Sequence, residues 1–297
     1  MITIIRKELA DYFTSIRCFI LFLLVVVASA VALYAAQQGI RGANAESGFI
    51  FMGLFTVGGD IPSLATFIAL LVPVIGIALG FDAINNERST GTLNRILSQP
   101  IYRDSVINGK FLAGMITLAI MIFAAMLLVA GYGLRMIGVP PAAEEIIRLF
   151  IYFVAVVIYG AFWMGLAILF SILFRSLAVS LLCPLAIWIL IGNPVFNPYI
   201  SFVVPAVTNS VGTYLMLLRI SPYFLFAEAT AALLDPLFRG LGILTISDTT
   251  GMLLFRPLSL DQSLLVVWPQ LTALICLTVI CFAVSYIVFM RQEIRST

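Results

Sequence analysis

Six long runs of apolar residues, none containing a charged side chain, divide this sequence. They extend over residues 18–36, 61–81, 111–134, 149–174, 177–196 and 264–290. A helix of roughly 20 apolar residues crosses the ~30 Å hydrocarbon core of a bilayer. A charge at the centre of such a helix costs on the order of 2.5–3.5 kcal/mol. The pattern therefore predicts an all-α integral membrane protein whose single domain, residues 1–297, has six spanning helices. We place these helices at 18–36, 61–84, 106–134, 149–174, 177–197 and 264–290.

The fifth run has two interpretations, because residues 176–218 carry no charge and could hold two short spans. Prolines interrupt the second half of this stretch, and proline removes a helical hydrogen bond and clashes with the preceding turn. A seventh span would also place the basic C-terminal segment outside. We therefore predict one span at 177–197, followed by an interfacial or re-entrant segment. The outer loop would extend over 198–262 and contain short helices, one of them near 226–234.

Basic residues between the runs indicate the orientation, because short cytoplasmic segments are enriched in Lys and Arg. With the N-terminus inside, the cytoplasmic side receives Arg6, Lys7, Arg17, Arg88, Arg95, Arg103, Lys110, Arg175, Arg291 and Arg295. The outer side receives Arg41, Arg135, Arg148, Arg219, Arg239 and Arg256. Three of these outer residues lie in the long loop, where the rule counts less. We predict a multi-pass protein of the cytoplasmic (inner) membrane with both termini in the cytoplasm.

The first sixteen residues have the pattern of an amphipathic helix. The apolar positions are Ile2, Ile5, Leu9, Tyr12 and Ile16, and the polar ones are Arg6, Lys7, Glu8, Asp11 and Ser15. This spacing predicts an interfacial helix over 1–16 on the cytoplasmic surface of the bilayer. The alternative is a secretory signal, because a basic start precedes an apolar run with small residues at 28–30. Since the apolar run continues to Ala36, we expect the segment to be retained as a span.

The composition agrees with a membrane protein and excludes several kinds of catalytic and metal site. Hydrophobic residues make up 62% of the chain and charged residues 10%, against about 25% in a typical soluble domain. A net charge of +2 does not indicate a nucleic-acid partner. The chain has no histidine, which excludes histidine bases and histidine metal ligands. The four cysteines, Cys18, Cys183, Cys276 and Cys281, lie within apolar runs without metal-ligand spacing, so we interpret them as small buried residues.

The polar segment between the second and third runs predicts a short helical hairpin over 87–100. Ser89 or Thr90 can cap a helix, and Pro100 ends it. The apolar face of that helix comprises Leu93, Ile96 and Leu97. Such a helix either docks into a groove of another protein or rests on lipid headgroups. Physical chemistry alone leaves both possibilities open.

The residues of this hairpin resemble a known signature. The pattern comprises Glu87-Arg88, Gly91-Thr92-Leu93, Leu97-Ser98, Pro100-Ile101, Arg103 and Gly109-Lys110. It is similar to the signature of permease subunits of ABC transporters of the ABC-2 type. The predicted interfacial helix, six spans, tiny loop at 174–176 and long outer loop agree with the architecture of that family. The chain departs from the commoner pattern at Ser89-Thr90 and Asn94-Arg95, so the resemblance implies the helix but not the details of its polar contacts.

The resemblance implies that the hairpin contains a coupling helix seated in a groove of a separate cytoplasmic ATPase subunit. The implied docking residues are Glu87, Arg88, Gly91, Thr92, Leu93, Ile96, Leu97 and Pro100. Leu93, Ile96 and Leu97 would form the docking face, with Glu87 and Arg88 as polar contacts at its root. Gly91 would permit close approach, and Pro100 would end the helix.

The resemblance also implies the composition of a complex. Two ATPase copies, carrying ATP and Mg²⁺, would serve two permease copies, most simply a homodimer in the lipid bilayer. No Gly-x-x-x-x-Gly-Lys-Ser/Thr phosphate loop occurs in this chain, so we expect it to be neither an enzyme by itself nor the holder of a cofactor. ATP would close the pair of ATPase subunits. Their motion would push the Thr92–Ser98 helix and tilt the spanning helices so that the pathway opens outward. A periplasmic partner could bind the outer loop.

Small residues recur at helical spacing in the first two runs. Gly76 and Gly80 in the second run, and Ala28, Ala32 and Ala36 in the first, fit close packing of membrane helices. For the glycines we predict packing within one subunit. For the alanines, packing within the subunit and contact with a second copy stay open.

Other functions have weaker support. Glu144, Glu145 and Arg148 resemble an element of CAAX-type intramembrane proteases, but the spacing differs and no histidine can hold the metal; acids at a helix start explain them. A membrane-embedded lipid enzyme lacks the necessary nucleophile and base. No charge lies mid-span, which disfavours an ion-coupled carrier. We therefore expect an exporter of a lipophilic or amphipathic substrate. The alternative is a permease that drives a periplasmic partner mechanically without carrying solute.

Overall fold

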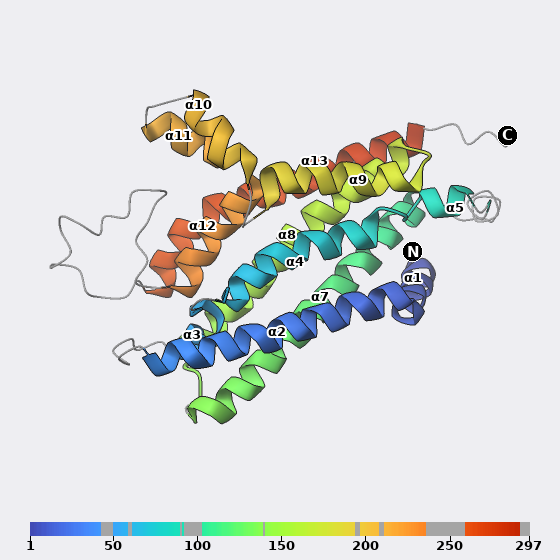
Figure 1. The fold of residues 1–297 in the computed structure, drawn as a ribbon. Helices are drawn as coiled ribbons and strands as arrows, with labels where there is room; N and C mark the ends of the chain where they lie inside the picture. The colour runs from blue at the N-terminus through green and yellow to red at the C-terminus, as the bar shows by residue number, and fades with distance from the viewer. Residues whose placement is uncertain are drawn as a thin grey trace.

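The fold is a bundle of long helices (Figure 1). The computed structural model describes residues 1–42, 50–58, 61–89, 91, 103–138, 140–193, 197–207, 211–235 and 259–291. Throughout this part of the chain the regular structure is helical, without strands. The prediction of an all-α fold is therefore confirmed.

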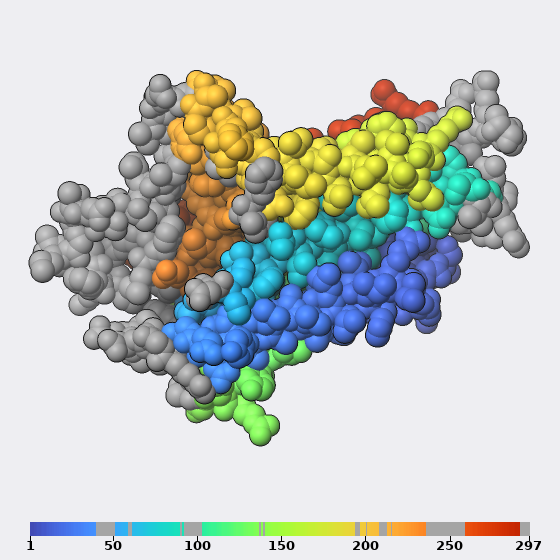
Figure 2. All heavy atoms as spheres, viewed as in Figure 1, coloured from blue at the N-terminus to red at the C-terminus, as the bar shows by residue number. Residues whose placement is uncertain are grey.

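Five helices in the described part of the chain are long and apolar enough to cross a membrane. They are α2 (Ile16–Gly42), α4 (Leu64–Gly80, extended by a turn and α5 to Ser89), α7 (Arg103–Ile137), α8 (Ala143–Leu173) and α13 (Leu260–Arg291). They correspond to predicted spans one, two, three, four and six. Helix α8 is the centre of the bundle and packs most extensively on α4 and α13. Figure 2 shows α2, α4 and α9 side by side on one face of the molecule.

The predicted fifth span is shorter than the other five. Helix α9 (Leu177–Ile187) continues as a π-helical turn, η1 (Trp188–Gly192), and together they fall below the length of the spanning helices. The chain then leaves the bundle through η2 (Tyr199–Val203), α10 (Val204–Val207) and α11 (Val211–Leu218), and returns as α12 (Pro222–Leu234), as Figure 1 shows. The sixth crossing therefore stays a prediction.

Helix α12 includes the segment 226–234 predicted to be a short helix, but it begins earlier, at Pro222. Ser221 explains the earlier start, because its hydroxyl accepts a hydrogen bond from the Phe224 N–H and Pro222 suits the first helical position. The Ser221 hydroxyl also donates to the carbonyl of Ile191, and the Asn197 side chain donates to the same carbonyl over 3.0 Å. These bonds hold the start of α12 against the end of η1.

A short helix between the first two long ones, α3 (Ile50–Thr56), was not predicted. Its side chains Phe51, Met52, Leu54 and Phe55 are buried. A Cβ at Gly133 of α7 would lie 2.1 Å from the Leu54 side chain, so this glycine permits their contact. The apolar stretch is too short to be recognised as a span, and its burial depends on neighbours distant in sequence.

The two glycines of α4 serve packing inside the chain, as predicted. A Cβ at Gly76 would lie 2.7 Å from the carbonyl oxygen of Gly160, and one at Gly80 would lie 2.7 Å from that of Met164, both on α8. Ala32 and Ala36 of α2 are fully buried within the chain, and Ala28 is half-buried. Intrachain packing thus accounts for Ala32 and Ala36, and a dimer contact through α2 stays a prediction.

Replacing Gly80 with valine should separate α4 from α8, because the added carbons would overlap backbone that cannot move aside. We expect a loss of about 3 kcal/mol of stability, at the upper end for overpacked cores. Thermal unfolding of the purified chain in detergent measures the effect. Gly131→Ala is the matched control, since nothing lies within 4 Å of a Cβ at that glycine of α7. Equal melting temperatures for the two variants would contradict close α4–α8 packing.

Candidate functional site

The root of the predicted hairpin is α5 (Asn85–Ser89), which follows α4 after a turn. Figure 1 shows α5 at the same end of the bundle as α1 (Ile2–Thr14) and the last turn of α13. This arrangement agrees with the prediction that both termini lie on the side of the hairpin. Orientation relative to the membrane stays a prediction.

The structure places only part of the predicted docking site. Thr92, Leu93, Ile96, Leu97 and Pro100 lie outside the described residues. Glu87 is buried, Arg88 is half-buried and Gly91 is exposed. Gly91 has a φ of 71°, in the region that favours glycine, and a Cβ there would meet nothing within 4 Å. The backbone conformation alone favours glycine at this position, and close approach of a partner at Gly91 stays a prediction.

A buried ionic cluster joins the hairpin root to two other helices. The Lys110 ammonium of α7 lies 2.8 Å from a carboxylate oxygen of Glu87 and 3.0 Å from one of Glu8 in α1. All three side chains are largely buried, with Lys110 only 5% exposed. Lys7, at the surface, lies 3.2 Å from Glu8 and 3.6 Å from Glu87. We call Lys7, Glu8, Glu87 and Lys110 the root cluster.

Charge balance explains why these groups are found together. A single charge buried away from water is costly unless it is paired and hydrogen-bonded. The two carboxylates face two ammonium groups, so the root cluster is neutral as a whole. Burial opposes the charged form of Lys7, but the carboxylates of Glu8, Glu87 and Asp11 outweigh it and raise the pKa of Lys7. Lys7 therefore stays charged at neutral pH.

The first turn of α5 is also attached to the opposite side of the bundle. The N–H groups of Ile84 and Asn85 both donate to the Ser171 hydroxyl of α8 over 3.1 Å. The Asn85 side chain donates to the Ser180 hydroxyl of α9 over 3.1 Å. Helix α5 is thus bonded to α1 and α7 through Glu87, and to α8 and α9 through its N-terminal end. Any displacement of the hairpin root would act on all four helices.

Helix α1 lies within the segment predicted to be an N-terminal helix, but its polar face differs from the prediction. Glu8 was assigned to the solvent-facing side, whereas it is buried against Lys110. Helix α1 packs on α7, where a Cβ at Gly109 would lie 2.8 Å from the Ile4 side chain. The Tyr12 hydroxyl donates to the Leu79 carbonyl over 3.0 Å, and burial first, with nearby Glu8, raises the pKa of Tyr12. Contacts with α4 and α7 thus hold α1 against the bundle, and its place in the membrane interface stays a prediction.

At the opposite end of the bundle, a second buried charge joins α8 to α12 and α13. Arg148 of α8 is completely buried and donates to Glu144, to the Leu233 carbonyl of α12 and to the Ser263 hydroxyl of α13. Glu145 accepts from the Ala142 N–H over 2.8 Å, at the start of α8. Both acids at this helix start thus have partners within the chain, Glu144 in Arg148 and Glu145 in the Ala142 N–H.

Sequence reasoning missed most of this site. From the sequence, Lys110 is only a cytoplasmic cation and part of the hairpin signature, Glu8 is only a polar position of the N-terminal helix, and Asn85 has no predicted role. A signal existed for Lys110, since a lysine that begins an apolar run needs a carboxylate if it is buried. Its partner could not be identified, because Glu8 lies 102 residues away in sequence. All four cysteines are free.

Comparison with known proteins identifies relatives. A family profile described as "ABC-2 family transporter protein" matches residues 2–294. A "Probable ABC transporter permease protein NosY" of Pseudomonas aeruginosa is 32% identical over 181 residues, which is 60% of this chain and 58% of that protein. The protein of the same name in Stutzerimonas stutzeri is 32% identical over 117 residues, 39% of each chain. The matched segments thus cover less than two thirds of these relatives.

Proposed function

Because the chain belongs to the ABC-2 family of transporter proteins, we propose that it is the permease subunit of an ATP-driven exporter. A separate cytoplasmic ATPase, which binds ATP and Mg²⁺, would dock on the hairpin at 87–100. Two ATPase copies and two permease copies would form the complex. The apolar character of the long helices favours a lipophilic or amphipathic substrate.

One observation supports the proposal that motion of the ATPase is transmitted to the spanning helices. Helix α5 is the only described segment of the hairpin apart from Gly91, and it is bonded to α1, α7, α8 and α9. A docked ATPase that moves the hairpin would therefore displace helices on both sides of the bundle at once. The root cluster would transmit this motion, because a buried ion pair resists separation in a medium of low dielectric constant.

Replacing Leu97 with aspartate tests the docking. The apolar docking face would then carry a charge with no partner in the groove, so we expect at least about a tenfold loss of bound ATPase. Co-purification with the ATPase and ATP-driven transport are the measurements. Asn94→Asp is the matched control, since it adds the same charge beside the predicted docking face. Unchanged co-purification in Leu97→Asp would overturn the docking role.

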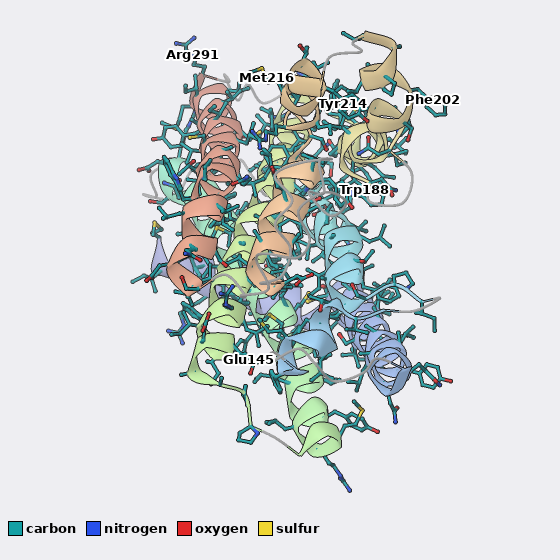
Figure 3. All side chains as sticks on the ribbon, turned by 90° about the vertical axis from the view of Figure 1, so that its left-hand side faces the viewer. Glu145, Trp188, Phe202, Tyr214, Met216 and Arg291 are labelled. Atoms are coloured by element: carbon teal, nitrogen blue, oxygen red, sulfur yellow. The ribbon has the colours of Figure 1, made fainter. Side chains whose placement is uncertain are left out.

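A second candidate function is mechanical transmission to a periplasmic partner without solute transport. The observation that favours it is the projecting segment η2–α11, where Phe202, Val207 and Met216 are 67%, 65% and 74% exposed. Figure 3 shows Phe202 and Met216 pointing outward from this segment. A purified complex that hydrolyses ATP and moves no solute, with a partner bound within 199–262, would support this function over export.

A further inference from the structure

A cavity of about 450 Å³ opens beside the root cluster, between α1, the start of α2 and the turn after α4. The side chains at its rim, Lys7, Asp11 and Arg17, are each more than half exposed. Its floor is formed by Glu8 and Lys110, which are buried. Ionic side chains thus line it from an open rim to a closed floor, and a polar group could enter from outside.

The lining of this cavity carries charges of both signs. Its cations are Lys7, Arg17 and Lys110, and its carboxylates are Glu8, Asp11, Asp82 and Glu87. Among the described residues that line it, carboxylates thus exceed cations by one, which favours an occupant with a cationic group. Arg17, which pairs with Asp82 and lies over the Phe81 ring, keeps 57% of its side chain exposed. Its guanidinium is therefore available to a phosphate in a bidentate geometry.

Apolar side chains surround the elbow between α1 and α2 beside this cavity. Phe13 is 54% exposed, Ile16 75%, Phe19 66% and Ile20 54%. In a membrane protein such side chains lie against lipid. The cavity therefore adjoins a surface on which acyl chains can lie, and a lipid could place its headgroup among the charges.

We infer that this cavity binds the headgroup of an aminophospholipid of the phosphatidylethanolamine type. The phosphate would lie on Arg17, and the ammonium would donate hydrogen bonds to Asp82 and Asp11. A choline headgroup has no N–H to donate and prefers aromatic cages, whereas Tyr12 is the one aromatic side chain among the described residues that line the cavity. A phosphatidylglycerol headgroup lacks the cation and would meet the excess negative charge. The expected preference is ethanolamine over choline, and choline over glycerol.

Lipid retention by the full-length chain tests this inference without any measurement of transport. The chain is reconstituted in nanodiscs of equal parts phosphatidylethanolamine, phosphatidylcholine and phosphatidylglycerol, and retained lipids are counted by native mass spectrometry. We expect the ethanolamine lipid to exceed the choline lipid by about twofold to fivefold. This is the ratio of affinities that corresponds to the free energy of an exposed ion pair. Arg17→Ala should remove this excess. Arg6→Ala, an exposed cation of α1 outside the cavity, should preserve it.

Two carboxylate variants give the expected change in selectivity. Asp82→Asn frees Arg17 and removes one negative charge, so retention should shift from the ethanolamine toward the glycerol lipid. Asp11→Asn, at the exposed rim, should lower the ethanolamine excess without disturbing the fold. Equal retention of ethanolamine and choline lipids by the unaltered chain would overturn the inference, as would an unchanged preference in Arg17→Ala. Failure of ATPase docking would leave these results intact, so the two proposals can fail separately.

Discussion

Replacing Lys110 with methionine is expected to uncouple ATP hydrolysis from transport and to destabilise the chain by about 3–5 kcal/mol, as when one partner of a buried ion pair is removed. Methionine preserves most of the side-chain volume, so the loss is one of charge. Glu8 and Glu87 would then face each other without the buried ammonium between them, and the half-exposed Lys7 would remain beside both. The two carboxylates would repel, and α5 would lose its attachment to α7.

Two measurements separate stability from coupling. Thermal unfolding in detergent reports the first, and ATP hydrolysis by the reconstituted complex with its transport rate reports the second. The triple variant Lys110→Met, Glu8→Gln and Glu87→Gln removes the cation together with both acids. We expect it to recover most of the melting temperature and to remain uncoupled. Normal coupling in this neutral variant would show that the root cluster stabilises the fold and does not transmit motion.

Replacing Arg148 with methionine, at the other end of the bundle, is also expected to destabilise the chain strongly. Arg148 is 0% exposed and connects α8 to Glu144, to the Leu233 carbonyl and to Ser263. Its removal leaves a buried carbonyl and a buried hydroxyl without their donor. Each such group costs about 1–3 kcal/mol, so the two together are expected to cost about 2–6 kcal/mol of stability.

Arg135→Met is the matched control for this variant, because Arg135 is an exposed arginine at the end of α7. Limited proteolysis within 236–258, together with thermal unfolding, measures how firmly α12 and α13 remain attached to α8. Faster cleavage in Arg148→Met than in Arg135→Met is the expected result. Equal cleavage rates and equal melting temperatures would contradict the role of Arg148 as a structural anchor.

Hydropathy predicted the long helices because the requirement for a span is local. A run of about 20 apolar residues suffices wherever it occurs in the chain, and charge exclusion marks its ends. Five predicted spans correspond to helices of spanning length, with ends that differ by a few residues. The hairpin signature also gave the correct family, since it lies in one continuous stretch that can be compared directly.

The region after α9 was harder to predict, because its helices end through tertiary contacts. The Ile191 carbonyl is satisfied by Asn197 and by Ser221, thirty residues further along the chain. These bonds replace the helical hydrogen bonds that a longer, continuous helix would form at this point. The prolines and the apolar composition of this region can be read from the sequence. Which distant hydroxyl donates to the carbonyl at the end of η1 cannot.

By itself, the sequence determined that this chain is a multi-span helical membrane protein of a transporter family with a polar segment between its second and third spans. Tertiary structure alone decided the site at the root of that segment. Glu8 appeared solvent-facing by periodicity, yet it is buried because Lys110, 102 residues away, needs a carboxylate in a medium that cannot solvate its charge. An apolar residue can be buried in apolar surroundings of any kind. Burying a charge requires one particular partner at one particular distance, and only the folded chain specifies that.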